Sequence, residues 1–193
     1  MLTYLALGDS YTIGEKVDLT DSFPYQLVQL LRKHNFTIAA PEIIAKTGFT
    51  TDELKTAIAK HVFQKEYDII TLLIGVNNQY RGRSVKEFSE EFEWLLLKAL
   101  SFKKASGKLI VLSIPDWGVT PFAADRDKNK IAGEIDLYND ACKNICAANN
   151  ITFIDITVSQ RKDNSPDFLA EDGLHPSAME YRKWATALCH LIG

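Results

Sequence analysis

The sequence lacks most of the features that mark secreted, membrane or nucleic-acid-binding proteins. It has only three cysteines, an odd number that suits free thiols in a reducing compartment better than a disulfide framework. No apolar run approaches the roughly 20 residues that a membrane span needs. Met1 leads into the first apolar run without the basic and long apolar segments of a secretory signal. We therefore expect a cytoplasmic protein with no membrane span.

The sequence also lacks a strong charge of either sign. Its formal net charge is −3, and no stripe of basic residues stands out, which argues against nucleic acid as a partner. The hydrophobic fraction of 46% and the charged fraction of 24% are typical of a globular protein. A chain of 193 residues is most simply one domain, residues 1–193, with one sizeable core.

Short apolar runs alternate with segments of helical periodicity along the whole chain. Strands are expected in the run before Gly8 and in Phe36–Ala45, Asp68–Ile74, Lys108–Ile114 and Ile151–Ile154. Helices are expected from Ser22 to about His34, from Thr51, from Ser84 to Lys104, from Ile131 to Asn149 and from Ser177 to Leu191. Irregular segments are expected at Pro115–Lys128 and from the fifth strand to Asp172. The alternation predicts a three-layer α/β sandwich with about five parallel strands, and it leaves the strand order open.

Several local signals refine this assignment. Asp68–Ile74 is almost continuously apolar, as in a central parallel strand that is buried on both faces. Pro41 suggests that the second strand lies at an edge of the sheet. Ser22 is expected to cap one helix, and Ser84 with Glu87 is expected to form a capping box at another.

Three small or polar residues follow three consecutive predicted strands: Ser10, Gly48 and Asn77. The carboxyl ends of parallel strands share one edge of a sheet, so these residues can converge. A serine hydroxyl is a candidate nucleophile. A glycine N–H, an asparagine amide and the N–H of Ser10 itself are donors suited to an oxyanion. The pattern therefore points to acyl transfer.

A serine nucleophile needs a base, and His175 is the best candidate of four histidines. His34 and His61 fall on helix surfaces, and His190 falls in the last turn of a helix. His175 instead lies in a short loop three residues after Asp172, where a turn would let this carboxylate accept from Nδ1. Glu171 is the alternative orienting acid.

With these residues, the chain resembles an SGNH hydrolase of the GDSL esterase/lipase family. Gly8-Asp9-Ser10 is similar to the first block of that family, Gly48 to the second, Gly75-x-Asn77 to the third and Asp172-x-x-His175 to the last. The blocks occur in the family's order and span nearly the whole chain. The resemblance implies a flavodoxin-like α/β/α fold and esterase chemistry that needs no metal or organic cofactor.

The resemblance also implies roles for single residues. Ser10 would be the nucleophile, His175 the base and Asp172 its partner. The N–H groups of Ser10 and Gly48 and the side chain of Asn77 would form the oxyanion hole. The chain departs from the family at Tyr11, where leucine is usual, and at Asn78, where aspartate is common.

Each of these residues also has a purely structural interpretation. Ser10 could cap a turn, Gly48 could serve a turn's geometry, and Asn77 could form an Asx turn. Asp9 is expected to be structural, since its side chain must point away from that of Ser10. Cys142, Cys146 and Cys189 are expected to be small buried side chains rather than metal ligands.

The substrate is the least defined part of the prediction. The loops at the active edge contribute aromatic residues expected to contact substrate: Tyr11, Phe49, Tyr80, Trp117 and Phe168. They suggest an open site for a small or medium acyl ester, a small-molecule substrate. Arg81 or Arg83 could meet an anionic headgroup, which would favour a lysophospholipase. A thioesterase with the same residues, or a non-catalytic ligand-binding module, would also fit this pattern. The sequence does not indicate the oligomeric state.

Overall fold

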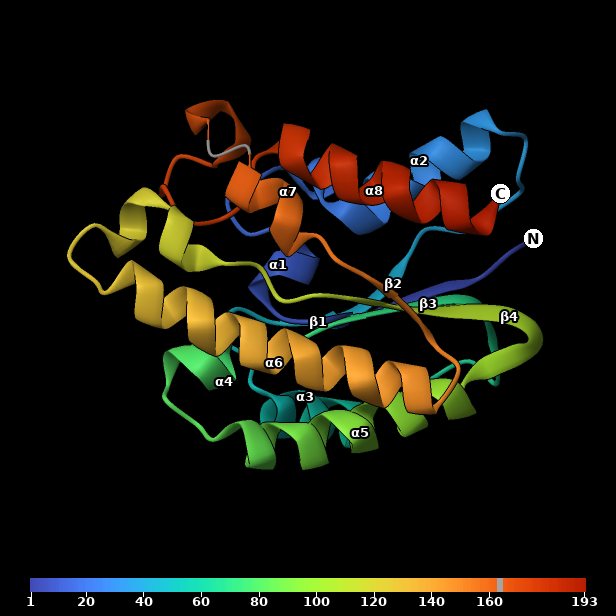
Figure 1. Cartoon of the computed structure of the whole chain (residues 1–193). Helices are drawn as coiled ribbons and strands as arrows, with labels where there is room; N and C mark the ends of the chain where they lie inside the picture. Colours follow the sequence, from blue (N-terminus) through green and yellow to red (C-terminus); the bar gives the residue numbers. More distant parts are fainter. Residues whose placement is uncertain (163–164) are drawn as a thin grey trace.

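The computed structural model describes residues 1–162 and 165–193. Its centre is a parallel sheet of five strands in the order β2-β1-β3-β4-β5 (Figure 1). The strands are β1 (Tyr4–Gly8), β2 (Glu42–Ala45), β3 (Tyr67–Leu73), β4 (Lys103–Leu112) and β5 (Thr152–Ile154). Helices cover both faces, so the predicted three-layer α/β sandwich is confirmed.

The helices divide between the two faces of the sheet. The chain forms α1 (Ser10–Ile13), α2 (Phe23–Lys33), α3 (Thr51–Lys60), α4 (Val76–Tyr80), α5 (Val85–Ser101), α6 (Lys128–Ala148), α7 (Thr157–Lys162) and α8 (Ala178–Ile192). Helices α2 and α8 pack together on one face, and α3, α5 and α6 lie on the other (Figure 1). Four 3-10 turns complete the described chain: Leu19–Asp21, Trp117–Val119, Pro121–Ala123 and Pro166–Phe168.

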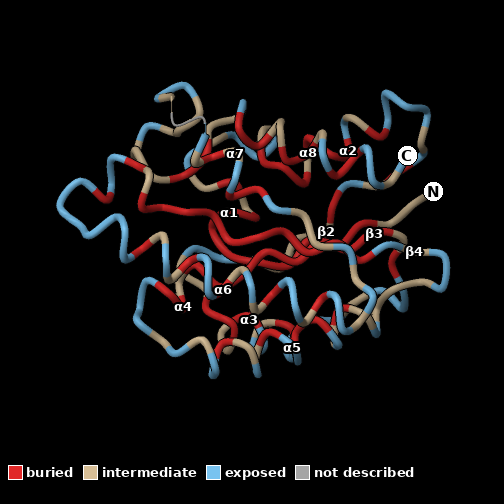
Figure 2. Tube along the Cα trace, in the orientation of Figure 1, coloured by how far each residue is buried: buried red, intermediate tan, exposed pale blue. Residues whose placement is uncertain are grey.

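The core lies along the two sides of the central strands. All five residues of β1 are buried, and β3 is buried at every position except Asp68, as Figure 2 shows along the middle of the molecule. Both strands have helices above and below, which explains their continuous apolar sequence. Large aromatic side chains fill the outer layers, among them Phe23 and Trp184 on one side and Phe88 and Tyr138 on the other.

The second strand lies at an edge of the sheet, as Pro41 predicts, but it is shorter than Phe36–Ala45. It begins only at Glu42. The preceding residues still follow the sheet, because Leu2 forms an isolated parallel bridge with Ile38. Proline has no N–H for the ladder, so the regular pairing starts after Pro41.

The boundary between α5 and β4 also differs from the prediction. The helix ends at Ser101 rather than Lys104, and the strand begins at Lys103 rather than Lys108. Residue Lys103 already pairs with Tyr67, and the register then shifts before Ile69. Gly107 lies where a Cβ atom would come within 2.8 Å of the Tyr67 carbonyl oxygen, so the strands approach too closely there for another side chain.

Other predicted boundaries and caps are partly wrong. Helix α6 begins at Lys128 rather than Ile131, because the side chain of Asp127 caps it by accepting from Lys130 N. Helix α7 lies within the stretch predicted to be irregular up to Asp172, and the part of that prediction at residues 163–164 lies outside the described residues. Ser22 occupies an N-cap position, but its hydroxyl donates to the Leu19 carbonyl instead of accepting from the helix.

The predicted capping box is half present. Ser84 accepts from Glu87 N at 3.1 Å. The reciprocal box, in which both side chains bond to backbone, occurs instead at Thr50 and Glu53 at the start of α3.

Candidate active site

The loops that follow the strands meet at one edge of the sheet, on the left in Figure 1, around an open cavity of about 200 Å³. The cavity is lined by Ser10, Tyr11, Thr47, Gly48, Val76, Asn77, Tyr80, Trp117, Phe122, Leu174 and His175. Four residues from distant parts of the sequence, Ser10, Gly48, Asn77 and His175, therefore share one cavity. Parallel strands impose this convergence because all of them point the same way.

Ser10 begins the short helix α1 directly after β1. Asp9 caps this helix, with its Oδ1 accepting from Tyr11 N at 3.0 Å. Gly8 leaves no room for a side chain, because a Cβ atom there would lie 2.4 Å from the Leu73 carbonyl oxygen. The tight strand-to-helix turn holds Ser10 at the cavity wall, where the residue is 4% exposed.

Asp172 and His175 form the contact that the sequence predicts. Asp172 Oδ2 lies 2.7 Å from His175 Nδ1, and Oδ1 accepts the backbone N–H groups of Leu174 and His175 at 3.0 Å. Partial burial raises the pKa of Asp172, but the hydrogen bonds from the His175 ring and from the two N–H groups outweigh burial and lower it below its ordinary value. A carboxylate can only accept, so Nδ1 carries the proton and a neutral ring has an unprotonated Nε2.

Glu171, the alternative acid, is directed elsewhere. Its side chain is 81% exposed and lies 3.9 Å from the Lys16 ammonium group. The carboxylate that contacts the His175 ring is therefore that of Asp172.

Ser10 and His175 line the same cavity, but no hydrogen bond joins their side chains in the part of the chain that the structure describes. Catalytic hydrogen bonds are often long in a protein without substrate. The ring of Tyr11 lies 5.1 Å from the ring of His175, tilted by 49°. Tyr11, the departure from the usual leucine, thus covers one side of the imidazole.

Gly48 and Asn77 also line the cavity. Gly48 has a φ of +82°, a left-handed conformation that glycine adopts without strain. Asn77 donates one amide hydrogen to the Phe49 carbonyl oxygen at 3.0 Å. An amide has two hydrogens, so the second one remains available to a ligand. Among the described residues no acceptor bonds to the Gly48 N–H.

Three aromatic rings form one side of the cavity mouth: Tyr80, Trp117 and Phe122. The Tyr80 and Trp117 rings are 5.3 Å apart, edge to face, and the Trp117 and Phe122 rings are 6.0 Å apart. Tyr80 and Phe122 are about half exposed. We call these three residues the aromatic wall.

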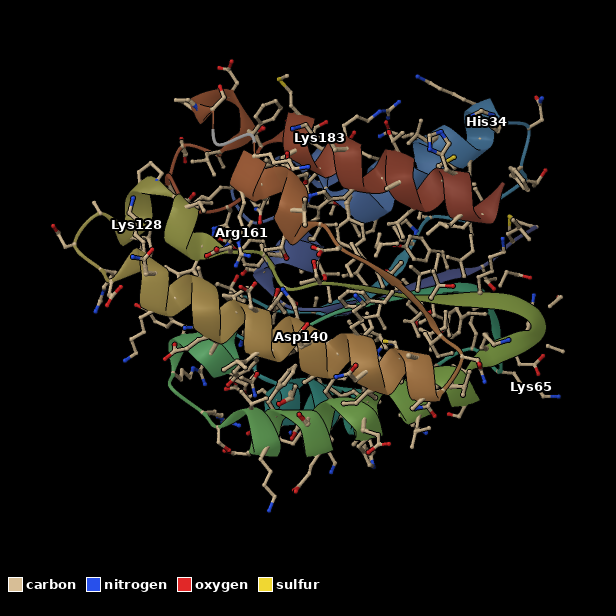
Figure 3. All side chains as sticks on the ribbon, viewed as in Figure 1. His34, Lys65, Lys128, Asp140, Arg161 and Lys183 are labelled. Carbon is tan, nitrogen blue, oxygen red and sulfur yellow. The ribbon has the colours of Figure 1, made fainter. Side chains whose placement is uncertain are left out.

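Polar side chains that the sequence does not predict fix Trp117 and its loop. Its indole N–H donates to Gln79 Oε1 at 2.7 Å. The neighbouring Asp116 is buried and accepts from Arg161 Nε at 2.8 Å, which ties the loop to α7 (Arg161 is labelled in Figure 3). Contacts between residues 38 and 45 positions apart leave no local pattern in a sequence.

Two residues predicted to contact substrate do not line the cavity. Phe49 packs partly buried against the hydrophobic core. Phe168 lies under the Lys183 ammonium group, 3.3 Å from its ring centroid, beside other surface grooves. Leu174 and Thr47 were not singled out, although each directly precedes a predicted site residue and lines the cavity.

Asp9 is an unusual group to find beneath a candidate nucleophile. The residue is fully buried, and among the described residues its Oδ2 has no hydrogen-bond partner. Burial raises the pKa of Asp9 to about 7, although the hydrogen bond from Tyr11 N lowers it in part. Sequence reasoning expected a structural side chain here and did not anticipate a buried carboxyl with an unpaired oxygen.

The remaining histidines and the cysteines lie at or close to their predicted places, although His34 and His61 follow the last residues of α2 and α3 rather than lying within a helix. His34, His61 and His190 are exposed, and His34 is labelled at the end of α2 in Figure 3. Cys142, Cys146 and Cys189 are free and buried in the core. No group of three or more His, Cys, Asp or Glu side chains with metal-binding geometry occurs among the described residues.

The family model described as "GDSL-like Lipase/Acylhydrolase family" matches residues 6–183 of the sequence. A comparison with curated proteins gives no significant match. In the part of the chain that the structure describes, no helix is long and apolar enough to cross a membrane.

Solved structures of esterases and acylhydrolases have the same fold. Axe2, an acetylxylan esterase from Geobacillus stearothermophilus, has a TM-score of 0.79 at 21% identity, over 100% of this chain and 94% of that one. A lipase/acylhydrolase from Enterococcus faecalis has a TM-score of 0.75 at 22% identity, over 100% and 95%. The psychrotrophic esterase EstA from Pseudoalteromonas sp. has a TM-score of 0.74 at 16% identity, over 99% and 97%. At these identities the likeness shows the fold alone.

Proposed function

Because the chain belongs to the GDSL-like lipase/acylhydrolase family and is a carboxylic ester hydrolase, we propose that it cleaves small or medium acyl esters through an acyl-enzyme on Ser10. The observation that carries this proposal is the meeting of Ser10, Gly48, Asn77 and the Asp172–His175 pair around one cavity. Nucleophile, base and oxyanion donors are the three elements that acyl transfer needs.

The reaction would proceed in two halves. Ser10 Oγ attacks the ester carbonyl and gives its proton to His175 Nε2, while the developing oxyanion is held by the N–H groups of Ser10 and Gly48 and by the Asn77 amide. The C–O bond to the alcohol breaks, and the alcohol leaves with the proton from His175. Water then attacks the acyl-enzyme with the same base, which releases the acid and restores Ser10. Asp172 stays ionised throughout and keeps Nδ1 protonated.

The shape of the cavity supports a small or medium acyl group. The site is an open hollow of about 200 Å³, bordered by the aromatic wall. Two rings of that wall are half exposed and offer apolar contact to a substrate. The fold is shared with an acetylxylan esterase, whose substrate carries a short acyl group.

The two arginines that would favour a lysophospholipase already have partners within the protein. Arg83 Nη1 lies 2.7 Å from Asp52 and within 3.8 Å of Glu87 and Glu91, so three carboxylates surround its charge. Arg81 donates to the Gly48 carbonyl oxygen and lies beside Glu53. A lysophospholipid headgroup would have to compete with these partners. An acyl-thioester would use the same machinery and remains the second candidate.

An acyl-length series tests the proposal. We expect p-nitrophenyl esters from acetate to hexanoate to give higher kcat/KM than the decanoate, a lysophospholipid or a long-chain acyl-CoA. Ser10→Ala should abolish turnover while its melting temperature stays close to that of the wild type. Ester hydrolysis that survives in Ser10→Ala would contradict the nucleophile assignment, and a preference for the long-chain substrates would contradict the substrate class.

A non-catalytic ligand-binding module is distinguished in the same assay. It would hydrolyse none of these esters but would still bind them, which isothermal titration with a slowly reacting ester would detect.

A further inference from the structure

The polar side chains of α4 and the residue after it hold the loop that carries Gly48. Asn77 donates to the carbonyl oxygen of Phe49, and Arg81 Nη2 donates to the carbonyl oxygen of Gly48 at 2.8 Å. Asn78 bonds to both the N–H and the hydroxyl of Thr51. Two consecutive carbonyl groups of this loop, together with the start of α3, are thus fixed from the segment that follows β3.

The bond from Arg81 matters because of where it acts. The peptide between Gly48 and Phe49 is held at both ends, its carbonyl by Arg81 and its N–H by the Lys46 carbonyl oxygen at 3.1 Å. Glycine rotates freely about φ, so nothing in Gly48 itself fixes the direction of its own N–H. The bond from Phe49 N to Lys46 O closes a turn around Gly48, and with the Gly48 carbonyl held by Arg81 this turn keeps φ at +82° and sets the direction of the Gly48 N–H.

Arg81 is itself anchored. Its Nη1 lies 3.4 Å from Glu53 Oε2, and this carboxylate is fixed by Thr50 through its N–H and its hydroxyl, both at 2.9 Å. A planar guanidinium can donate to two acceptors at once in a set geometry, which a lysine ammonium on a flexible chain cannot reproduce. The side chain therefore connects the rigid N-terminus of α3 to the glycine loop.

We propose that Arg81 is a positioning residue that aims the Gly48 N–H at the oxyanion of the transition state. This inference rests on the proposed function, because it assumes that Gly48 is an oxyanion donor. Arg81 does not take part in the chemistry and does not need to touch the substrate. Its effect should appear in the step where negative charge develops on the carbonyl oxygen, and much less in ground-state binding.

Arg83 provides a matched control. It lies two residues further on and also bonds α3, through Asp52 at 2.7 Å, but among the described residues its side chain makes no hydrogen bond or ion pair with the Gly48 loop. Removal of Arg83 tests whether the loss of an ion pair between α3 and the segment after α4 is sufficient to impair the enzyme.

The experiment compares Arg81→Ala, Arg81→Lys and Arg83→Ala with the wild type, with p-nitrophenyl acetate as substrate. We expect Arg81→Ala to lower kcat by about 10- to 100-fold, the cost of a small misplacement of a catalytic group. Its KM should stay within about twofold of the wild-type value, as expected for an interaction made only in the transition state. Added guanidinium ion should restore part of the lost kcat. Arg81→Lys should fall between Arg81→Ala and the wild type, and Arg83→Ala should keep kcat within about twofold, as surface ion pairs contribute little.

Two results would overturn the proposal. One is an unchanged kcat in Arg81→Ala, and the other is an equal loss in Arg83→Ala, which would show that the ion pairs act only through general stability. If Arg81→Ala does not fold, Arg81→Lys decides the question, because lysine keeps the positive charge but lacks the planar set of donors of the guanidinium group. An unchanged kcat in Arg81→Lys also counts against the proposal. Failure of the proposed function is recognised separately, by full activity of Ser10→Ala.

Discussion

Besides the aromatic wall, two groups of residues that line the cavity are held in different ways. The donor wall consists of the lining residues Gly48 and Asn77. It is fixed by the side chains of Asn77 and Arg81, which bond to backbone 28 and 33 residues away in the sequence. The base wall consists of the lining residues Leu174 and His175. It is fixed by a turn in which Asp172 contacts a ring only three residues away. Long-range tertiary contacts hold one wall, and a local turn holds the other.

The difference matches what each wall would have to do. Oxyanion donors work by being in place before the charge develops, so anchoring by distant, rigid elements suits them. A base first takes a proton from Ser10 and then gives it to the leaving group. For this task a fixed tautomer of the ring matters more than anchoring by distant elements. Asp172 supplies the tautomer and also makes the turn, through its two oxygen atoms.

The largest effect should come from separating these two tasks of Asp172. In Asp172→Asn the side-chain oxygen can still accept the two backbone N–H groups, so the turn survives. The amide then donates to Nδ1, and the ring carries its proton on Nε2, where it cannot act as a base. We expect kcat to fall by about 10⁴-fold, the loss seen when an orienting aspartate in a catalytic triad becomes asparagine. Steady-state kinetics measure the loss of kcat, and a melting curve shows whether the turn survives.

Asp172→Ala serves as the companion variant. It removes both the orienting contact and the turn, so its melting temperature should fall below that of Asp172→Asn. If Asp172→Asn keeps more than about a tenth of the wild-type kcat, Asp172 does not set the tautomer of His175 and the base wall is organised differently.

On the donor wall, Asn77→Ala should lower kcat by about 10²–10³-fold with a small change in KM. The substitution removes one donor and also leaves the Phe49 carbonyl oxygen without its partner. Asn77→Asp keeps the shape but replaces the donors with a negative charge, so it should lose at least as much. If kcat is unchanged in Asn77→Asp, the Asn77 side chain is not a donor of the oxyanion hole.

The smallest effect on activity concerns Asp9, the fully buried residue directly before Ser10. Its pKa is raised from 3.8 to about 7 in the folded protein, so the folded state holds a proton that the unfolded state has already lost between these pH values. The free energy of unfolding of the wild type should therefore fall as pH rises through that window, by about 1.4 kcal/mol per pH unit. Below the window the carboxyl is protonated in both states, and this contribution no longer changes with pH.

Asp9→Asn keeps the cap to Tyr11 N and cannot ionise. The difference between its free energy of unfolding and that of the wild type should grow between about pH 4 and about pH 7 in urea denaturation. Stability curves that stay parallel across this range would show that Asp9 does not titrate there.

Much of this arrangement can be predicted from the sequence, because the geometry of parallel sheets is regular. Continuous apolar runs such as Asp68–Ile74 predict central strands, and residues after strand ends must share one edge. That reasoning brings Ser10, Gly48 and Asn77 together before their distances are known. The Asp172–His175 contact is predictable because it depends on a local turn.

The rest depends on contacts that only the folded chain defines. Two examples are the bond from Arg81 to Gly48 and the bond from Trp117 to Gln79. These residues come close together only because of the strand order, and the alternation of helices and strands does not predict that order. Aromatic residues in loops are equally ambiguous. Tyr80 and Trp117 line the cavity, whereas Phe49 packs against the core, and no feature of the local sequence separates these outcomes.

The central claim is that the Ser10 hydroxyl is the nucleophile activated by His175. The most direct measurement is peptide mass spectrometry after reaction with a fluorophosphonate, on the wild type and on His175→Ala. We predict one adduct per chain, on the peptide that contains Ser10, and a strongly slowed reaction in His175→Ala. An adduct on another residue, or no adduct in a sample that hydrolyses esters, would contradict the account.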